Sequence, residues 1–256
     1  MTASLPFSGE YTEYVPSDAL RPFVECLWTR GSPSSGMAPY HVLPDGCVDI
    51  MLAYRSGGTA PDAALAVGTM TRPLVVRAGE PGTFIGVRFW PGRAYPVLGM
   101  PAAELTDLRV DVGDVWRDGA RDVESLDLGD LSTLFASFEQ LLRRRLARAP
   151  SGNVTVDAAV CAIRRAQGNL SIAALAPALG VTRQYLARAF ALHVGVPPKT
   201  FARVVRVRST LERARVAATV DWAALALEAG YYDQAHLAGE VKELTGRSPG
   251  EWVGAS

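Results

Sequence analysis

Cysteine and histidine are scarce in this chain of 256 residues. There are three of each, and they are scattered along the sequence: Cys26, Cys47 and Cys161, and His41, His193 and His236. An odd, dispersed set of cysteines argues against a disulfide framework and favours a reducing compartment. So few and so widely spaced histidines argue against a zinc cluster or a multi-histidine iron site, and we expect neither a metal nor a cofactor.

Long apolar runs are also missing. No stretch approaches the roughly 18 consecutive apolar residues of a membrane helix, and the first six residues lack the positive charge of a secretory signal. The composition, with 48% hydrophobic and 20% charged residues, is nevertheless that of a folded protein. We expect a cytoplasmic protein without membrane contact, built as one large domain or two small ones.

The net charge is zero, but the two halves differ in sign. Residues 1–150 carry 14 arginines and 18 acidic residues, whereas residues 151–256 carry 12 basic and 8 acidic residues. The most basic part is 161–220, with ten basic residues and one glutamate. This split indicates a basic module for a polyanion joined to an acidic partner domain. Chance clustering in an arginine-rich sequence would produce the same pattern.

The first 110 residues or so are predicted to be rich in β-structure. Short β-prone segments bounded by Gly, Pro or the loop Ser56-Gly57-Gly58 lie at 47–54, 64–68, 74–77 and 83–90. Short strands at such close spacing favour a small barrel or sandwich. Helices are predicted at 94–99, 101–105 and 131–148, the last of them amphipathic with arginines, including Arg148, near its end. The segment Ala149 to Asn153 then interrupts the pattern, so we place a domain boundary there and predict domains of 1–150 and 151–256.

The second domain contains an internal repeat. Residues 171–176 match residues 221–226 at an offset of 50, and Gly180 matches Gly230. Each copy has the layout of a helix-turn-helix, with an N-cap residue before each helix and a glycine in the turn. After the glycine the offset becomes 51, which aligns the following pairs: Leu186 with Leu237, Phe190 with Val241, Gly195 with Gly246, and Pro198 with Pro249.

A long helix is predicted between the two copies. Residues 198–217 carry apolar side chains at helical spacing and would span about 30 Å at ~1.5 Å per residue. One turn of B-DNA is ~34–36 Å long, so one chain can place two recognition helices in successive major grooves. A plain helical bundle with repeats for packing is the alternative, and the basic charge of this region favours DNA.

These motifs resemble those of AraC/XylS-type bacterial transcription regulators over about 100 residues, 155–253. The resemblance rests on residues 175–180, 185–190, 195–198, 229–237 and 246–249. It implies an all-α domain with two helix-turn-helix units that bind double-stranded DNA, with RNA polymerase as a further partner to consider. Residues 11–116 resemble an N-terminal domain that accompanies this module, on residues 20–28, 43–49 and 86–92. We interpret that domain as a small cupin-like barrel with flanking helices, which makes the whole an α+β protein of two domains.

Candidate DNA-contacting residues follow the N-cap of each second helix. In the first copy, Arg183, Gln184, Ala187 and Arg188 lie opposite the apolar stripe, and the resemblance places the last three at base-facing positions. Arginine pairs with guanine and glutamine with adenine, although each arginine could instead contact phosphate. The arginines of the connecting helix are either phosphate contacts or solvated charges, and we select Arg206 and Arg208 as the phosphate contacts.

The second copy departs from the resemblance. Gln234, Ala235 and His236 hold the corresponding positions, with His236 equally open to a structural role. Gly239 stands where an arginine is usual, and Glu240 beside it would repel phosphate. We therefore expect the second copy to discriminate bases less strongly than the first.

The N-terminal domain offers little for catalysis, and we expect no enzyme. It has one histidine and no serine in a triad signature. A DNA-repair domain that accepts an alkyl group on Cys26 or Cys47 is the alternative, although the usual zinc site would need four cysteines.

Ligand sensing fits the N-terminal domain better. Asp49 lies among apolar residues on one strand face, and Arg88 and Trp90 share a face on another strand, so together they could hold a small-molecule effector. A structural ion pair or contact with water is the alternative for the two charges. The apolar stripe of the helix at 131–148 could pack on its own domain or join two chains in a homodimer.

Overall fold

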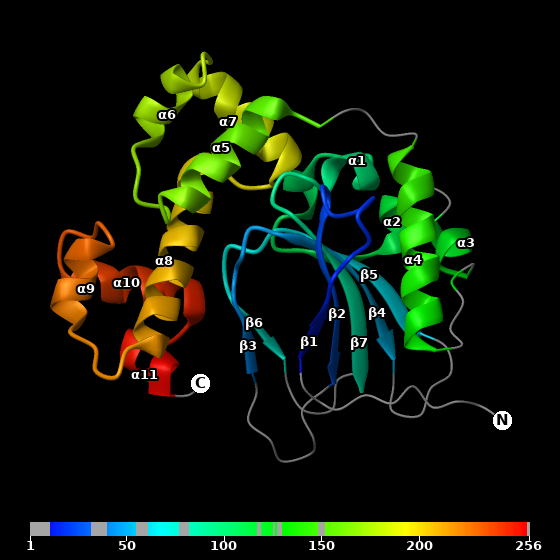
Figure 1. Ribbon diagram of the computed structural model, residues 1–256, viewed down its shortest axis with the longest axis horizontal. Helices are drawn as coiled ribbons and strands as arrows, with labels where there is room; N and C mark the ends of the chain where they lie inside the picture. Colours follow the sequence, from blue (N-terminus) through cyan, green and yellow to red (C-terminus); the bar gives the residue numbers. More distant parts are fainter. Residues whose placement is uncertain are drawn as a thin grey trace.

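The computed structural model describes residues 11–31, 40–54, 61–76, 82–116, 119–124, 126, 130–147 and 152–254. The predictions that concern the Ser56-Gly57-Gly58 loop, Arg77, Arg148 and residues 149–151 lie outside this set. Figure 1 shows two parts, a β-sheet with attached helices and a group of helices that ends the chain. In the described part no helix has the length and apolarity to cross a membrane.

The first part is an antiparallel sheet of six strands in the order β1-β2-β7-β4-β5-β8. A separate pair, β3 and β6, covers part of it. The bounds are β1 Thr12–Tyr14, β2 Val24–Gly31, β3 Tyr40–Val42, β4 Val48–Tyr54, β5 Ala63–Val67, β6 Leu74–Val76, β7 Thr83–Phe89 and β8 Arg109–Asp111.

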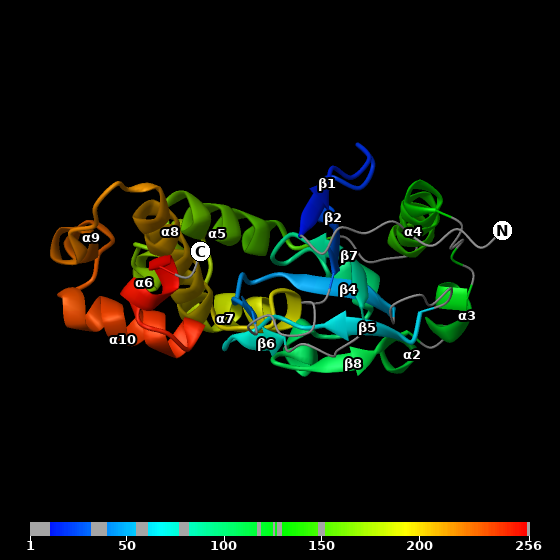
Figure 2. The same cartoon turned by 90° about the horizontal axis from the view of Figure 1, so that it is seen from below.

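The prediction of a closed, cupin-like barrel is wrong, because the described strands form an open sheet. β1 and β8 stand at opposite edges of the sheet, and each is only three residues long. Such short strands present few backbone groups for a closing ladder. Helices cover one face of the sheet instead, as Figures 1 and 2 show. The four predicted strands are present within about one residue, while β1, β2, β3 and β8 were not predicted.

The two faces of the sheet carry different sets of side chains. Val48, Ile50 and Leu52 of β4 pack with the helices into the main core of this part. Met51 and Ala53 point the other way and belong to a smaller cluster with Trp28 and Phe84. The helices are α1 Tyr95–Leu98, the 3₁₀ helix η1 Ala102–Leu105, α2 Val112–Val115, α3 Gly119–Glu124 and α4 Leu131–Leu146.

The apolar stripe of α4 packs on its own sheet. Leu134, Phe138, Leu141 and Leu142 are each at most 1% exposed and belong to the main core of the first part. The helix begins at the side-chain cap of Asp130. Its stripe is therefore covered within the chain and is not available as a surface that joins two copies.

The second part consists of helices, as expected after Val154. They are α5 Val154–Arg165, α6 Ile172–Ala178, α7 Arg183–His193, α8 Pro198–Val216, α9 Trp222–Glu228, α10 Gln234–Thr245 and α11 Pro249–Gly254. The predicted caps are present: Ser171, Thr182, Asp221 and Asp233 each accept a backbone N–H of the helix that follows. Gly180 and Gly230 adopt φ of 69° and 79°, the left-handed conformation that ends a helix.

Helix α8 is shared by the two helix-turn-helix units. Phe201 and Ala202 near its start belong to the core of the first unit, together with α5, α6 and α7. Val204, Val207 and Leu211 further along belong to the core of the second unit, with α9 and α10. Because one rigid helix contributes to both cores, the separation of the two units is set by its 19 residues.

The two parts contact each other at the end of α7. The hydroxyls of Thr69 and Thr106 donate to the carbonyls of Val194 and Gly195, at 2.5 and 2.6 Å. These bonds satisfy carbonyl groups that the end of a helix leaves free. They fix the first helix-turn-helix unit against the sheet domain.

Candidate DNA interface and ligand cavity

Helix α7 presents a polar face to solvent. Leu186 and Phe190 are buried, whereas Arg183, Gln184, Ala187 and Arg188 are all exposed. The Thr182 hydroxyl accepts the backbone N–H of Tyr185 at 3.1 Å and holds the start of the helix. The structure thus brings the four candidate residues of the first copy together on one free surface of α7.

Helix α10 has a smaller polar face. Gln234, Ala235 and His236 are exposed. The ring of His236 is engaged locally, because its Nδ1 accepts the backbone N–H of Tyr232 at 3.4 Å and the ring lies edge-on to Tyr231. Tyr232 itself is 86% exposed beside the start of α10, and sequence analysis did not select it. The signal that could have pointed to Tyr232 is a large aromatic residue in the turn, where side chains are commonly exposed.

Gly239 faces open space, since a Cβ atom there would meet no heavy atom within 4 Å. Close packing therefore does not explain the glycine. Glu240 next to it is partly buried, with a side chain 11% exposed. Arg203 Nε donates to Glu240 Oε1 at 3.0 Å, and Arg206 Nη2 donates to Oε1 and Oε2 at 2.9 and 2.8 Å.

The two arginines selected on α8 as phosphate contacts already have partners inside the chain. Arg206 is bound to Glu240 and its guanidinium lies 4.4 Å from the ring centre of Tyr231. Arg208 faces the sheet domain and donates to the Pro44 carbonyl at 3.5 Å. Arg206 is thus held within the chain, whereas Arg208 is exposed. Their contacts with phosphate stay a prediction.

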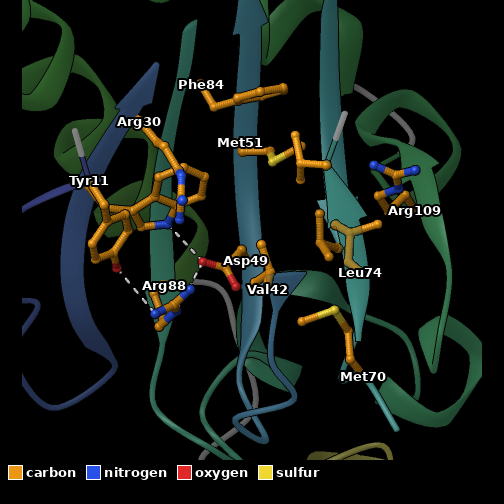
Figure 3. A pocket seen from close by; sticks show the side chains of 13 residues that line it. Tyr11, Arg30, Val42, Asp49, Met51, Met70, Leu74, Phe84, Arg88 and Arg109 are labelled. Carbon is orange, nitrogen blue, oxygen red and sulfur yellow. Dashed lines mark hydrogen bonds and ion pairs between the residues drawn. The ribbon is translucent and has the colours of Figure 1, made fainter. Parts of the chain in front are cut away.

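A cavity of about 80 Å³ lies between the β-sheet and the β3–β6 pair. Figure 3 shows apolar side chains from both sheets pointing into it, among them Val42, Met51, Leu74 and Phe84. Charged side chains stand around the apolar part: Arg30, Asp49, Arg88 and Arg109. Apolar walls with a few polar groups are typical of small-molecule sites.

Asp49 and Arg88 face each other across the β4–β7 ladder. Arg88 Nε lies 3.2 Å from Asp49 Oδ1 and 3.4 Å from Asp45 Oδ2, and Trp28 Nε1 donates to Asp49 Oδ1 at 2.7 Å. Burial raises the pKa of Asp49 to about 6, against the opposing effect of Arg88. The two charges therefore form the ion pair that the sequence analysis gave as the alternative, and both also line the cavity.

Trp90 lies away from the cavity, contrary to the prediction. β7 ends at Phe89, so the alternation of side chains does not continue to residue 90. Trp90 Nε1 donates to the Arg21 carbonyl at 3.0 Å, and the Arg164 guanidinium lies 4.7 Å from the ring centre. Its contacts are structural and join the sheet domain to α5.

The cysteines of the sheet domain are poorly suited to accept an alkyl group. Cys26 and Cys47 are both buried. Burial raises the pKa of Cys26 to about 12 and the pKa of Cys47 well above its ordinary value, so both stay protonated at neutral pH. Because the thiolate is the nucleophile, this environment disfavours the repair alternative.

Comparisons with known proteins match the two parts separately. A family model described as "Helix-turn-helix domain" matches residues 175–255. Residues 175–255 are an AraC-type helix-turn-helix domain. The chain therefore contains the DNA-binding domain of a transcription regulator. A second family model, described as "Domain of unknown function (DUF6597)", matches residues 12–111, which include the sheet that precedes the helix-turn-helix domain.

Solved structures give weaker similarities. Apo ToxT, in a substituted form from Vibrio cholerae strain SCE256, has 10% identity and a TM-score of 0.46, and the match covers 89% of this chain and 96% of that one. Wild-type ToxT from the same strain with a bound unsaturated fatty acid has 10% identity, a TM-score of 0.44 and coverage of 89% and 93%. These scores are too low to assign a ligand to this chain. A comparison with curated protein sequences gives no match.

Proposed function

We propose that the chain binds a specific operator with α7 and α10 in successive major grooves of one DNA duplex. The observation that carries this is the pair of capped recognition helices attached to one helix, α8, which is about 28 Å long at ~1.5 Å per residue. That length is close to one turn of B-DNA. A single chain would then contact two half-sites, without a second copy.

Selection of bound sequences from random DNA tests the proposal. We expect two half-sites whose centres are about 10 base pairs apart, with a weak binding preference at the positions between them. A single half-site, or no enrichment of any sequence by a chain that is folded, would contradict it.

We assign base contacts to Arg183, Gln184 and Arg188 of α7 and to Gln234 of α10. Ala187 and Ala235 leave room for a base edge or a thymine methyl group. His236 is better suited to hold the turn before α10, because its ring already accepts a backbone N–H there. The first half-site should therefore carry most of the sequence information.

We propose that the cavity between the sheets binds a small effector molecule. Its apolar walls suit an apolar body, and Asp49 and Arg88 at one side offer an acceptor and donors for a polar group. A screen of small molecules by thermal unfolding tests this. A ligand at 100 times its Kd should add about 2.7 kcal/mol to the free energy of unfolding.

The matched variant for this screen is Val67→Phe, which places extra atoms in the cavity from a lining position. A compound that stabilises the wild-type chain and not the variant binds in the cavity. A compound that stabilises both equally binds elsewhere, and a screen with only such compounds would contradict the effector proposal while leaving DNA binding intact.

We propose that effector binding in the cavity affects DNA binding through the segment from His41 to Cys47. It contacts the cavity through Val42 and through Asp45, which lies 3.4 Å from Arg88 Nε. It also contacts the helical domain: His41 Nδ1 lies 3.2 Å from the Thr245 carbonyl at the end of α10. Gly46, with φ of 81°, lies against Phe201 of α8.

An effector that binds Arg88 would compete with Asp45 and loosen this segment. Asp45→Asn imitates that loss without a ligand. We expect faster amide hydrogen exchange in α8 of this variant, and unchanged exchange in the control Asp114→Asn, which alters an exposed carboxylate on α2. Changes confined to β4 and β7 would rule out this route.

A further inference from the structure

The ion cluster around Glu240 lies at the junction between the second recognition helix and the connecting helix. Glu240 is on α10, and Arg203 and Arg206 are on α8. Three hydrogen bonds of 2.8 to 3.0 Å join the carboxylate to the two guanidinium groups. Arg203 Nη2 also donates to Glu243 Oε2 at 2.5 Å.

The Glu240–Arg206 pair in this cluster is largely shielded from water, unlike a typical surface ion pair. The side chains of Glu240 and Arg206 are 11% and 16% exposed, and Tyr231 covers the Arg206 guanidinium. Exposed pairs contribute little, whereas removal of one partner from a buried, hydrogen-bonded pair leaves an uncompensated charge. Glu240 is thus the one acceptor that the two arginines share.

The first helix-turn-helix unit is packed against the same junction. Gly168, with φ of 76°, approaches the backbone of Ala202 and Arg206 so closely that a Cβ atom would collide with both. Gly230, in the turn of the second unit, lies directly against the side chain of Asn169 in the first. These close contacts and the ion cluster therefore restrain α10 and the first unit relative to α8 at one place.

We propose that Glu240 is a positioning residue that fixes α10 on α8 and so sets the spacing and angle at which the two half-sites are bound. This rests on the proposed binding of two half-sites. It also explains an acidic residue on a helix that faces DNA, because the two arginines compensate its charge.

Binding titrations of Glu240→Ala against a selected operator distinguish positioning from simple charge. If Glu240 only repels phosphate, its removal should tighten binding to every sequence. If it positions α10, binding to the operator should weaken by about tenfold, which corresponds to ~1.4 kcal/mol. Discrimination between base pairs at the second half-site should also fall, while discrimination at the first half-site should stay unchanged.

The control is Glu243→Ala, on the same helix and bound to the same Arg203, but with a side chain 62% exposed. This variant removes an equal charge but leaves the ion pairs of Glu240 in place. Operators with one base pair inserted between the half-sites provide a second measurement. We expect the insertion to weaken the binding of wild type and Glu243→Ala strongly, and that of Glu240→Ala much less, because a loosened α10 tolerates the shift.

Glu240→Gln keeps an acceptor oxygen. It serves as the second variant if Glu240→Ala does not fold. Helix content by circular dichroism shows which variants are folded. The proposal requires the glutamine variant to fall between wild type and alanine in half-site discrimination. It is overturned if Glu240→Gln, folded, binds all sequences more tightly, or if the penalty for the inserted base pair is the same as in wild type. Loss of all sequence preference by the wild-type chain would instead refute the two-half-site function.

Discussion

At the scale of single residues, Arg188 is the clearest candidate for a base contact. It is exposed on the free face of α7, and no hydrogen bond or ion pair within the described residues engages its side chain. Arg188→Ala should cost roughly 1–3 kcal/mol of binding free energy at one base pair of the first half-site. Titrations against operators changed at single positions measure it, with Arg144→Ala on α4 as the control. An equal loss on random DNA would make Arg188 a phosphate contact.

At position 239, a substitution is expected to strengthen DNA binding. Arginine there would extend into open space, add a cation near the DNA and restore helix propensity worth up to about 1 kcal/mol. We expect Gly239→Arg to bind the operator more tightly than wild type. Gly250→Arg, at an equally open position, adds the same charge on another helix, α11. Equal tightening by both would show only a general effect of charge.

Asp49 makes the stability of the chain depend on pH. Burial raises its pKa from 3.8 to about 6, so between these values the folded chain holds more protons than the unfolded chain. The contribution of Asp49 to the free energy of unfolding therefore falls as pH rises from about 4 to 6. Asp49→Asn retains an acceptor for Trp28 and should remove this slope in denaturant titrations. Asp114→Asn should retain it, and the same slope in both variants would refute the assignment.

At the scale of elements, the turn between α5 and α6 should tolerate change less than the turn between α6 and α7. Gly168 and Gly180 both have positive φ, but only Gly168 lies against the backbone of α8, whereas Gly180 meets nothing within 4 Å. We expect Gly180→Ala to cost about 1 kcal/mol for the left-handed conformation, and Gly168→Ala distinctly more because of the collision. Thermal unfolding of the two variants compares them, and equal losses would mean that α8 moves aside easily.

Sequence patterns predicted elements best where the deciding chemistry is local. The caps Ser171, Thr182, Asp221 and Asp233 each act within three residues of their own position, so the helices of both repeats could be assigned from the sequence. The edge strands β1 and β8 have three residues each, too few to show a clear alternation. Whether short strands close a barrel depends on how the whole sheet is paired, which the sequence alone does not contain.

At the scale of the whole molecule, the ion pairs that the sequence did not predict join distant residues. Arg206 and Glu240 are 34 residues apart, and Asp49 and Arg88 are 39 apart. Sequence analysis selected Asp49 and Arg88 correctly as a pair of charges but could not place them in one ladder. It selected Arg206 for its positive charge. It could not show that Arg206 forms an ion pair with Glu240 inside the chain.

The sharing of α8 has a consequence for any attempt to divide the molecule. A chain that stopped after residue 217 would expose Val204, Val207 and Leu211, which are each at most 4% exposed in the intact protein. The fragment would present an apolar stripe along its last helix and tend to aggregate. A fragment from residue 218 onward would lack those three side chains and have too small a core to fold. The helical half should therefore melt in one cooperative transition, although its sequence is a repeat.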